Sequence, residues 1–252
     1  MRGSLRNRER RTRKAPRGKP IALAFKVAGE SCLVVELGAG ISVRASNRVR
    51  ALGIALERAR MAGLTEVVPT YHSLAVYYDP LILNVEALQA SVRETVRHLQ
   101  EIPLPPPRLT ELPTVYGGLY GPDLPFVAQH TGLSEGEVIR LHSRPKYHVY
   151  MIGFTAGFAY LGGLPSRLVT PRLPSPRLRV PAGSVGIGGV QTGTHPIDNP
   201  SGWRIIGRTP VRLFDPTREV PTPVLPGDKV RFVPISEAEY LANGGAPAEP
   251  FA

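Results

Sequence analysis

The pattern of apolar and polar residues becomes regular after residue 20. Apolar stretches at residues 21–27 and 31–37 are separated by the turn Ala28-Gly29-Glu30, which predicts a β-hairpin. Residues Val49, Leu52, Leu56 and Ala59 then recur at helical spacing. This spacing predicts an amphipathic helix over residues 44–62, ended by Gly63.

A second pair of strands and a second helix follow. Residues 66–69 and 73–78 have the composition of strands, and Asn84 can cap a helix whose apolar face is formed by Val85, Leu88, Val92, Val96 and Leu99. The resulting order is ββαββα. Two helices that each bury one stripe against a small sheet predict a compact α+β domain over residues 21–102.

A proline-rich segment separates this domain from a different pattern. Pro103, Pro105, Pro106, Pro107 and Pro113 favour an extended connection, because each ring removes a backbone donor. Beyond it we expect a strand at Val115-Tyr116, a helix over residues 123–130 and a helix from the capping box of Ser134 and Glu137 to His142.

From Lys146 the helical signals end and short apolar runs alternate with Gly and Pro. The runs are Tyr147–Gly153, Ser184–Ile187, Trp203–Gly207, Val211–Phe214 and Lys229–Val233. They predict a small closed β-barrel. The whole chain is therefore predicted to be α+β, with a basic disordered extension at 1–20, a ββαββα domain at 21–102, a β-barrel domain at 103–236 and a flexible tail at 237–252.

The net charge of +11 lies mostly at one end of the chain. Residues 1–20 hold nine Lys/Arg and one Glu. Such a segment can bind nucleic acid through counterion release, but it lacks interleaved aromatic residues, so we expect a solvated extension. We expect no other nucleic-acid contact. No run approaches the roughly 18 apolar residues of a membrane helix, so we expect no membrane span and a cytoplasmic protein.

Several kinds of active site are excluded by the motifs that the sequence lacks. It contains no GxxxxGK[ST] phosphate loop and no HExxH, and Gly183-Ser184-Val185-Gly186 departs from the GxSxG nucleophile motif. The single cysteine, Cys32, has no partner for a disulfide or a CxxC metal site, so no metal is expected.

Two glycine-rich segments, residues 153–163 and 180–196, are candidate ligand loops. Backbone N–H groups there could cradle an anion or a planar amide. The alternative is that a small barrel needs glycine at its corners. Residues 144–231 contain twelve Lys/Arg and four acidic residues, which favours an anionic ligand.

Individual side chains near these loops have two interpretations each. Arg204 or Arg208 could bind a carboxylate or phosphate through its guanidinium fork, or could be a solvated surface residue. His195 could transfer a proton, with Asp198 as the nearest acid, or could be structural. Trp203, the sole tryptophan, could fill the barrel or form a wall against which a ligand stacks.

As a series, the motifs resemble a known family. They are Tyr116-Gly-Gly-Leu-Tyr-Gly-Pro-Asp-Leu124, Tyr150-Met-Ile-Gly-Phe154, Gly157-Phe-Ala-Tyr-Leu-Gly-Gly-Leu-Pro165, Val180-Pro-Ala-Gly-Ser-Val-Gly-Ile187, Gln191-Thr-Gly193 and Gly202-Trp203 with Ile206-Gly-Arg-Thr-Pro210. Over residues 21–235 the chain resembles the B subunit of 5-oxoprolinase, a family also called allophanate hydrolase subunit 1 and histidine-kinase inhibitor.

The resemblance implies a cyclophilin-like barrel behind a small α+β domain. It also implies two partners, the C and A subunits of 5-oxoprolinase, which together with this chain would use ATP to cleave 5-oxoproline, a small anionic amide, to glutamate. Because this chain has no nucleotide-binding motif, ATP is expected to bind another subunit. A fused version of the two barrels serves as the carboxyltransferase domain of urea carboxylase.

The resemblance and the residues together give a set of candidate site residues. We expect His195 and Asp198 to be catalytic. The residues expected to bind substrate are Phe154, Gly183, Ser184, Gln191, Thr192, Gly193, Trp203, Arg204 and Arg208. The chain departs from the usual family pattern at Ala156, Ala159, Val190, His195 and Ser201, all in or beside the presumed ligand loops.

Three other functions stay open at this point. The chain could inhibit a sensor histidine kinase by docking on it. It could be a carboxyltransferase or allophanate-hydrolase component acting on urea-like amides with a separate biotin carrier, because no Met-Lys-Met motif is present. The basic extension could also bind RNA.

Overall fold

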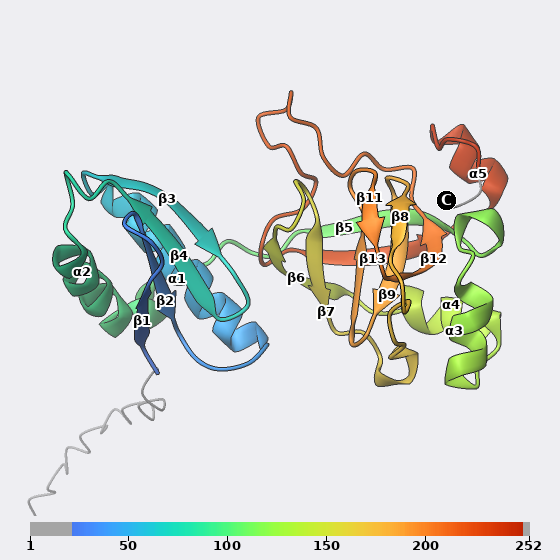
Figure 1. The fold of residues 1–252 in the computed structure, drawn as a ribbon, viewed down its shortest axis with the longest axis horizontal. Helices are drawn as coiled ribbons and strands as arrows, with labels where there is room; N and C mark the ends of the chain where they lie inside the picture. Colours follow the sequence, from blue (N-terminus) through green and yellow to red (C-terminus); the bar gives the residue numbers. More distant parts are fainter. Residues whose placement is uncertain (1–21, 249–252) are drawn as a thin grey trace, which may run out of the picture.

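The computed structural model describes residues 22–248, whose two main hydrophobic cores are joined by an extended segment (Figure 1). The first core lies in a four-stranded sheet covered by two helices, and the second lies in a closed barrel. The α+β class and the barrel are thus confirmed. The predicted basic extension, residues 1–20, lies outside the described residues, and the predicted domain limits stay predictions.

The first unit has the predicted order ββαββα. Its elements are β1 (Ala24–Val27), β2 (Cys32–Glu36), α1 (Val43–Ala59), β3 (Leu64–Pro69), β4 (Ser73–Tyr78), α2 (Val85–Arg97) and the 3-10 helix η1 (Leu99–Glu101). The strands pair antiparallel in the order β1-β2-β4-β3, and α1 packs against β3, β4 and α2. The predicted hairpin is present, with Val27 opposite Leu33 in its register.

Local capping explains the limits of the two helices. Ser42 and Asn84 precede α1 and α2, and each side chain accepts a hydrogen bond from a backbone N–H of the first turn. The first helix ends three residues before the predicted limit, because Arg60 adopts a left-handed conformation, with φ of 44°, and closes it. Gly63 lies in the turn beyond and does not end the helix.

The barrel closes through seven strands. They are β5 (Leu109–Tyr116), β6 (Tyr147–Ile152), β7 (Ala159–Gly162), β9 (Ser184–Gly188), β10 (Gln191–Thr194), β12 (Arg204–Arg208) and β13 (Lys229–Pro234). Their order around the barrel is β10-β7-β6-β13-β5-β12-β9, and all neighbours are antiparallel except β5 and β13. A separate two-stranded sheet pairs β8 (Arg177–Val180) with β11 (Asn199–Ser201).

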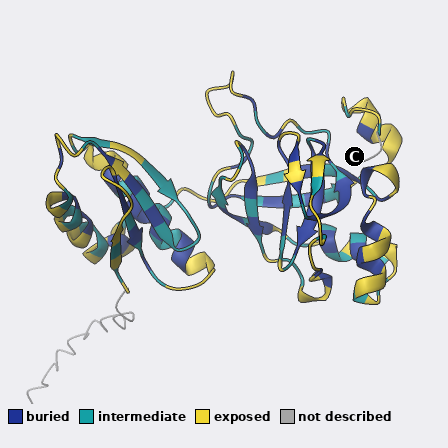
Figure 2. Cartoon of the chain, viewed as in Figure 1, coloured by how far each residue is buried: buried dark blue, intermediate teal, exposed yellow. Residues whose placement is uncertain are grey.

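Short helices cover the barrel on the side away from the first unit (Figure 1). They are η2 (Gly118–Tyr120), α3 (Leu124–Thr131), α4 (Glu135–Ser143), η3 (Ser166–Leu168) and α5 (Glu237–Ala242). The predicted capping box of Ser134 and Glu137 begins α4. Buried residues gather on the strands of both units, whereas the outer faces of α2, α3 and α5 are exposed (Figure 2).

Three predictions about elements of the barrel unit are wrong. Residues 211–214 form no strand, and strand β5 begins at Leu109 rather than at Val115. The early start includes Pro113, which the barrel tolerates because only β13 pairs with β5 at that point. The tail predicted to be flexible from residue 237 begins with helix α5, which Ser236 caps and whose Tyr240 is fully buried.

Candidate functional site

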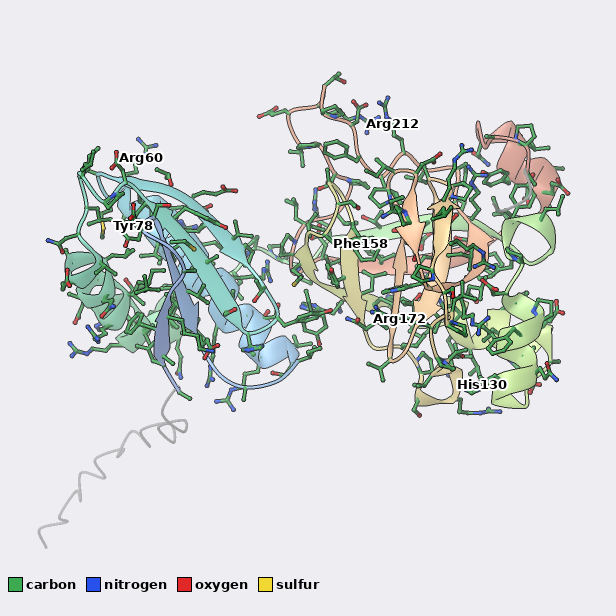
Figure 3. All side chains as sticks on the ribbon, in the orientation of Figure 1. Arg60, Tyr78, His130, Phe158, Arg172 and Arg212 are labelled. Carbon is green, nitrogen blue, oxygen red and sulfur yellow. The ribbon has the colours of Figure 1, made fainter. Side chains whose placement is uncertain are left out.

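A pocket of about 280 Å³ opens on the barrel beside the two-stranded sheet. Its walls combine aromatic rings with a few polar side chains, which is typical of small-molecule sites. The lining residues are Phe154, Phe158, Tyr160, Arg172, Pro176, His195, Pro200, Ser201, Gly202 and Trp203. Phe158 and Arg172 are labelled in Figure 3. Three of the predicted site residues, Phe154, His195 and Trp203, therefore meet in one pocket.

His195 follows β10 and is held by its backbone before its ring enters the pocket. Its N–H donates to Ser184 O at 2.8 Å, and its carbonyl accepts from Gly183 N–H at 2.7 Å. The ring is 2% exposed, with Nδ1 at 2.9 Å from Asn199 Oδ1. Since a carboxamide oxygen accepts, Nδ1 carries the proton and Nε2 is left with a lone pair.

The Nε2 atom of His195 is buried and has no hydrogen-bond partner among the described residues. Burial lowers the pKa of His195 to about 4, although the contact with Asn199 opposes the shift. The ring is therefore neutral at pH 7. A buried polar atom without a partner is unusual in a folded protein and indicates a ligand or an ordered water.

An aromatic wall stands beside His195. The rings of Phe158 and Trp203 meet edge to face with centroids 5.7 Å apart, and both lie against His195, at 5.6 and 6.3 Å. Two glycines make room for the indole: a Cβ on Gly188 would lie 2.6 Å from Trp203 Cε2, and one on Gly193 would lie 3.3 Å from Trp203 Cζ3. Trp203 thus both fills space over β9 and β10 and faces the pocket.

The segment before β7 places Phe154 at the edge of the pocket. Phe154 has a φ of 67°, a left-handed conformation that bulky residues rarely adopt. Its side chain is 71% exposed and meets Phe158 with ring centroids 5.9 Å apart. Backbone strain of this kind persists only where surrounding structure holds it, and it is frequent at functional sites.

Among the described residues that line the pocket, Arg172 is the one with a permanent charge. Its guanidinium carbon lies 5.8 Å from the centroid of the Trp203 ring, and it makes no ion pair with any described residue. An arginine stacked on an aromatic face keeps its N–H groups free for an anion. The pocket therefore combines an uncharged acceptor, a flat aromatic wall and one positive charge.

The predicted anion-binding arginines lie outside this pocket. Arg204 is 9% exposed, pairs with Asp123 at 3.8 Å and stacks on Phe126, whose ring centroid is 3.5 Å from its guanidinium carbon. Arg208 donates from Nε to Ala182 O at 2.9 Å. The contacts of Arg204 are internal, because Asp123 is itself buried and holds Arg177 through two hydrogen bonds.

Asp198 also lies apart from His195. It accepts from Arg179 Nε at 2.7 Å and from Ala182 N–H at 2.8 Å. Burial opposes the shift, but these two donors hold the pKa of Asp198 below its usual value. Its carboxylate thus supports the loop before β9, and the residue that contacts the His195 ring is Asn199.

The remaining predicted residues do not line the pocket. Ser184 and Thr192 are fully buried; Ser184 Oγ donates to Pro181 O, and Thr192 Oγ1 donates to Gly186 O. Gly183 lies in a turn with a φ of 82°. Gln191 donates to the hydroxyl of Tyr71, which comes from the turn between β3 and β4 and packs on Tyr160.

Seven lining residues were not predicted as site residues: Phe158, Tyr160, Arg172, Pro176, Pro200, Ser201 and Gly202. Phe158 and Tyr160 are two positions apart, so a strand starting here places both on one face. That spacing was a usable signal. Nothing in the sequence distinguishes Arg172 from the other eleven basic residues of the barrel segment, because its position over Trp203 depends on folding.

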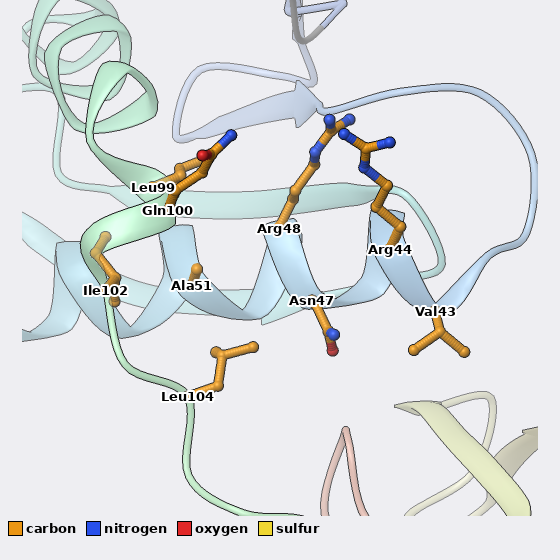
Figure 4. A pocket seen from close by; sticks show the side chains of 9 residues that line it. All are labelled: Val43, Arg44, Asn47, Arg48, Ala51, Leu99, Gln100, Ile102 and Leu104. Atoms are coloured by element: carbon orange, nitrogen blue, oxygen red, sulfur yellow. The ribbon is translucent and has the colours of Figure 1, made fainter. Parts of the chain in front are cut away.

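A larger hollow, of about 590 Å³, lies beside α1 in the first unit (Figure 4). Arg44 and Arg48 extend from α1 at this hollow, and Leu104 of the connecting segment forms its opposite side. Its nine lining residues include none of the predicted site residues. Within residues 22–248, no group of His, Cys, Asp or Glu side chains is arranged to hold a metal ion, and no helix has the length and apolar character to span a membrane.

Comparison with known proteins adds a family context to this geometry. Residues 23–224 match the family model for the carboxyltransferase domain, subdomain C and D. A protein of Escherichia coli O157:H7, named as the B subunit of 5-oxoprolinase, is 44% identical over 212 residues, which cover 83% of this chain and 94% of that protein.

Solved structures agree with the fold. The crystal structure of TTHA0988 superposes with a TM-score of 0.72 at 39% identity, covering 87% of this chain and 41% of that longer chain. The urea amidolyase of K. lactis superposes equally well, with a TM-score of 0.72 over 90% of this chain and 16% of that one, but at 20% identity it shows the fold alone.

Proposed function

The chain belongs to the family of 5-oxoprolinase B subunits, and on that premise we propose that it is one component of an ATP-dependent 5-oxoprolinase. The complex would open the lactam of 5-oxo-L-proline to give L-glutamate, with the A and C subunits as partners in the cytoplasm. The observation that carries this proposal is the 44% identity over 94% of the E. coli relative.

The pocket at His195 is consistent with a small ring as substrate. Its volume of about 280 Å³ suits a compact molecule, and its single arginine suits one carboxylate better than a triphosphate. We therefore assign ATP binding to another subunit. Opening a lactam requires activation of a poor electrophile, and preorganised donors or phosphorylation of the amide oxygen would lower that barrier.

A side chain at Gly202 offers a direct test of the pocket. A Cβ built on Gly202 would meet its nearest neighbours at 3.8 to 3.9 Å, and these include Pro176 and Arg172 of the lining. Gly202→Leu should therefore fill the pocket without a backbone clash. Gly136→Leu is the matched control, since Gly136 lies on α4 with open space around it.

The experiment combines the purified chain with its candidate partner subunits and measures ATP-dependent release of glutamate from 5-oxoproline, omitting each protein in turn. We expect activity only with all subunits present, a loss of at least about tenfold with Gly202→Leu, and little change with Gly136→Leu. Glutamate release that is unchanged when this chain is omitted would contradict the proposed function. Full activity of Gly202→Leu would instead place the site elsewhere on the complex.

A further inference from the structure

Two features of the pocket specify which ligand chemistry it can recognise. Nε2 of His195 is a buried acceptor that lacks a partner among the described residues, and Arg172 is a cation at the mouth with no ion pair in that same part of the chain. Both lie against the indole of Trp203, His195 with ring centroids 6.3 Å apart and Arg172 with its guanidinium carbon 5.8 Å from the centroid. His195, Arg172 and Trp203 therefore lie around the same pocket.

The direction of each interaction follows from the hydrogen bonds already present. With Asn199 Oδ1 facing Nδ1 of His195, the proton lies on Nδ1 and Nε2 is the acceptor, which suits a ligand that brings an N–H or O–H donor. Arg172 can only donate, so the ligand must bring an anionic oxygen. The rings of Phe158 and Trp203, which meet edge to face, supply the apolar part of the same pocket.

Building on the proposed function, we propose that this pocket recognises the substrate through three groups: His195 Nε2 accepts the lactam N–H, Arg172 binds the ring carboxylate, and Trp203 packs against the ring. His195 and Arg172 are thereby specificity-determining residues, one for the donor and one for the anion. The low pKa of His195 is consistent with this role, because a protonated ring would present a donor to the lactam N–H instead of an acceptor.

The preorganisation of His195 supports the assignment. His195 is already oriented by Asn199 and by its own backbone bonds to Gly183 and Ser184, so little ordering remains when a ligand binds. Conversely, an analogue without the N–H would leave Nε2 buried and unpaired. A site built to pair a ligand group discriminates strongly against the molecule that lacks it.

Trp203 is the sole tryptophan of the chain, so its fluorescence reports on this pocket directly. The test titrates the full-length chain with 5-oxo-L-proline, with the γ-lactone carboxylate in which ring oxygen replaces N–H, and with 2-pyrrolidinone, which lacks the carboxylate. We expect 5-oxoproline to bind, and each analogue to bind at least about tenfold more weakly.

Substitution separates the two contacts. Arg172→Gln should weaken 5-oxoproline to about the affinity of 2-pyrrolidinone and leave 2-pyrrolidinone itself unchanged, whereas the control Arg167→Gln, an exposed arginine outside the lining, should change neither. On the unsubstituted chain, ¹⁵N NMR of the histidine rings should show His195 protonated at Nδ1, and its Nε2 resonance should shift with 5-oxoproline but not with the lactone.

Three results would overturn the recognition mode: no response of Trp203 to 5-oxoproline, equal binding of lactam and lactone, or an Arg172→Gln effect that is the same with and without the carboxylate. If the assembled subunits still release glutamate in those cases, the proposed function stands and the substrate binds elsewhere. If the chain binds as described but the complex releases no glutamate, the proposed function fails and the recognition mode stands.

Discussion

His142 and His195 lie in the same barrel and are both almost completely buried, at 0% and 2% exposure, but their ring nitrogens meet different surroundings. His142 on α4 is satisfied on both sides: Tyr116 Oη lies 2.8 Å from Nδ1, and Thr192 Oγ1 lies 2.8 Å from Nε2. Because Thr192 gives its own hydrogen to Gly186 O, His142 must donate from Nε2 and accept from Tyr116 at Nδ1.

His195 has a partner at Nδ1 and none at Nε2 among the described residues. The difference separates a structural histidine from a recognition histidine on physical grounds. In the structural histidine, His142, both ring nitrogens are paired, so replacing the residue lowers stability. In the second, one buried acceptor remains for a ligand, and the fold carries the cost of leaving that atom unpaired.

The largest effect expected from this difference is on stability at His142. His142→Ala should lower the free energy of unfolding by about 3 to 5 kcal/mol, because it opens a cavity and leaves the hydroxyls of Tyr116 and Thr192 without their partner. Urea denaturation measures the change. The exposed His130→Ala is the control and should stay within about 0.5 kcal/mol of the unsubstituted chain. A loss below about 1 kcal/mol would mean that His142 is not the structural member of the pair.

Lowering the pH should reduce the free energy of unfolding, because burial lowers the pKa of both histidines. Burial lowers the pKa of His142 from 6.5 to about 3 and that of His195 to about 4. Below pH 6.5 the unfolded chain therefore binds more protons than the folded chain, and the free energy of unfolding falls as the pH decreases toward those folded values. Between pH 7 and pH 5 each histidine accounts for a loss of about 2 kcal/mol, or about 4 kcal/mol together.

Urea denaturation at pH 7, 6 and 5 checks this slope. In His195→Asn the slope should become shallower, since one buried histidine is removed while His142 and His148, whose pKa is also lowered by burial, still titrate. A slope equal to that of the unsubstituted chain would be inconsistent with a neutral buried His195. Saturation with 5-oxoproline should raise stability at pH 7 by pairing Nε2 of His195, which offers a second way to separate the two histidines.

A smaller effect is expected from the packing beneath the pocket wall. In Gly188→Ala the added methyl group would meet the Trp203 indole at 2.6 Å, so the ring must move. We expect a loss of about 1 to 3 kcal/mol in the free energy of unfolding and a shift of Trp203 fluorescence to longer wavelength as the indole turns toward solvent. Gly136→Ala, in open space on α4, is the control, and it should be neutral or slightly stabilising. An unshifted Trp203 emission in Gly188→Ala would contradict the close packing.

Local signals predicted much of the fold. The side chains of Asn84 and Ser134 cap α2 and α4 as expected, because a capping side chain and the N–H groups it satisfies lie within one turn. The hairpin of β1 and β2 follows from a three-residue turn and two apolar runs. Prediction failed where strand formation depended on a neighbouring strand. Strand β5 includes Pro113, which its pairing with β13 tolerates, and residues 211–214 have an apolar pattern but no partner strand among the described residues.

The candidate site was predicted only in part for the same reason. The residue types of His195, Trp203 and Phe154 and the glycine-rich segments around them indicate a site, and all three share the pocket. Arg204 and Arg208 have residue types equally suited to an anion, but Arg204 is engaged by Asp123, 81 positions earlier in the chain, and Arg208 by the Ala182 carbonyl. Arg172 cannot be distinguished from the other basic residues by sequence, because residue type does not reveal which charge remains without an ion pair.

The amino-acid sequence by itself determined the order of elements, the ends of the capped helices and the family, since these depend on apolar periodicity, on contacts within a few residues and on the order of motifs. Which acid neutralises which arginine, and which ring nitrogen of His195 stays without a partner in the described chain, were decided by the tertiary structure alone. Pairing and desolvation depend on distances between residues far apart in the chain, and those distances exist only after the barrel has closed.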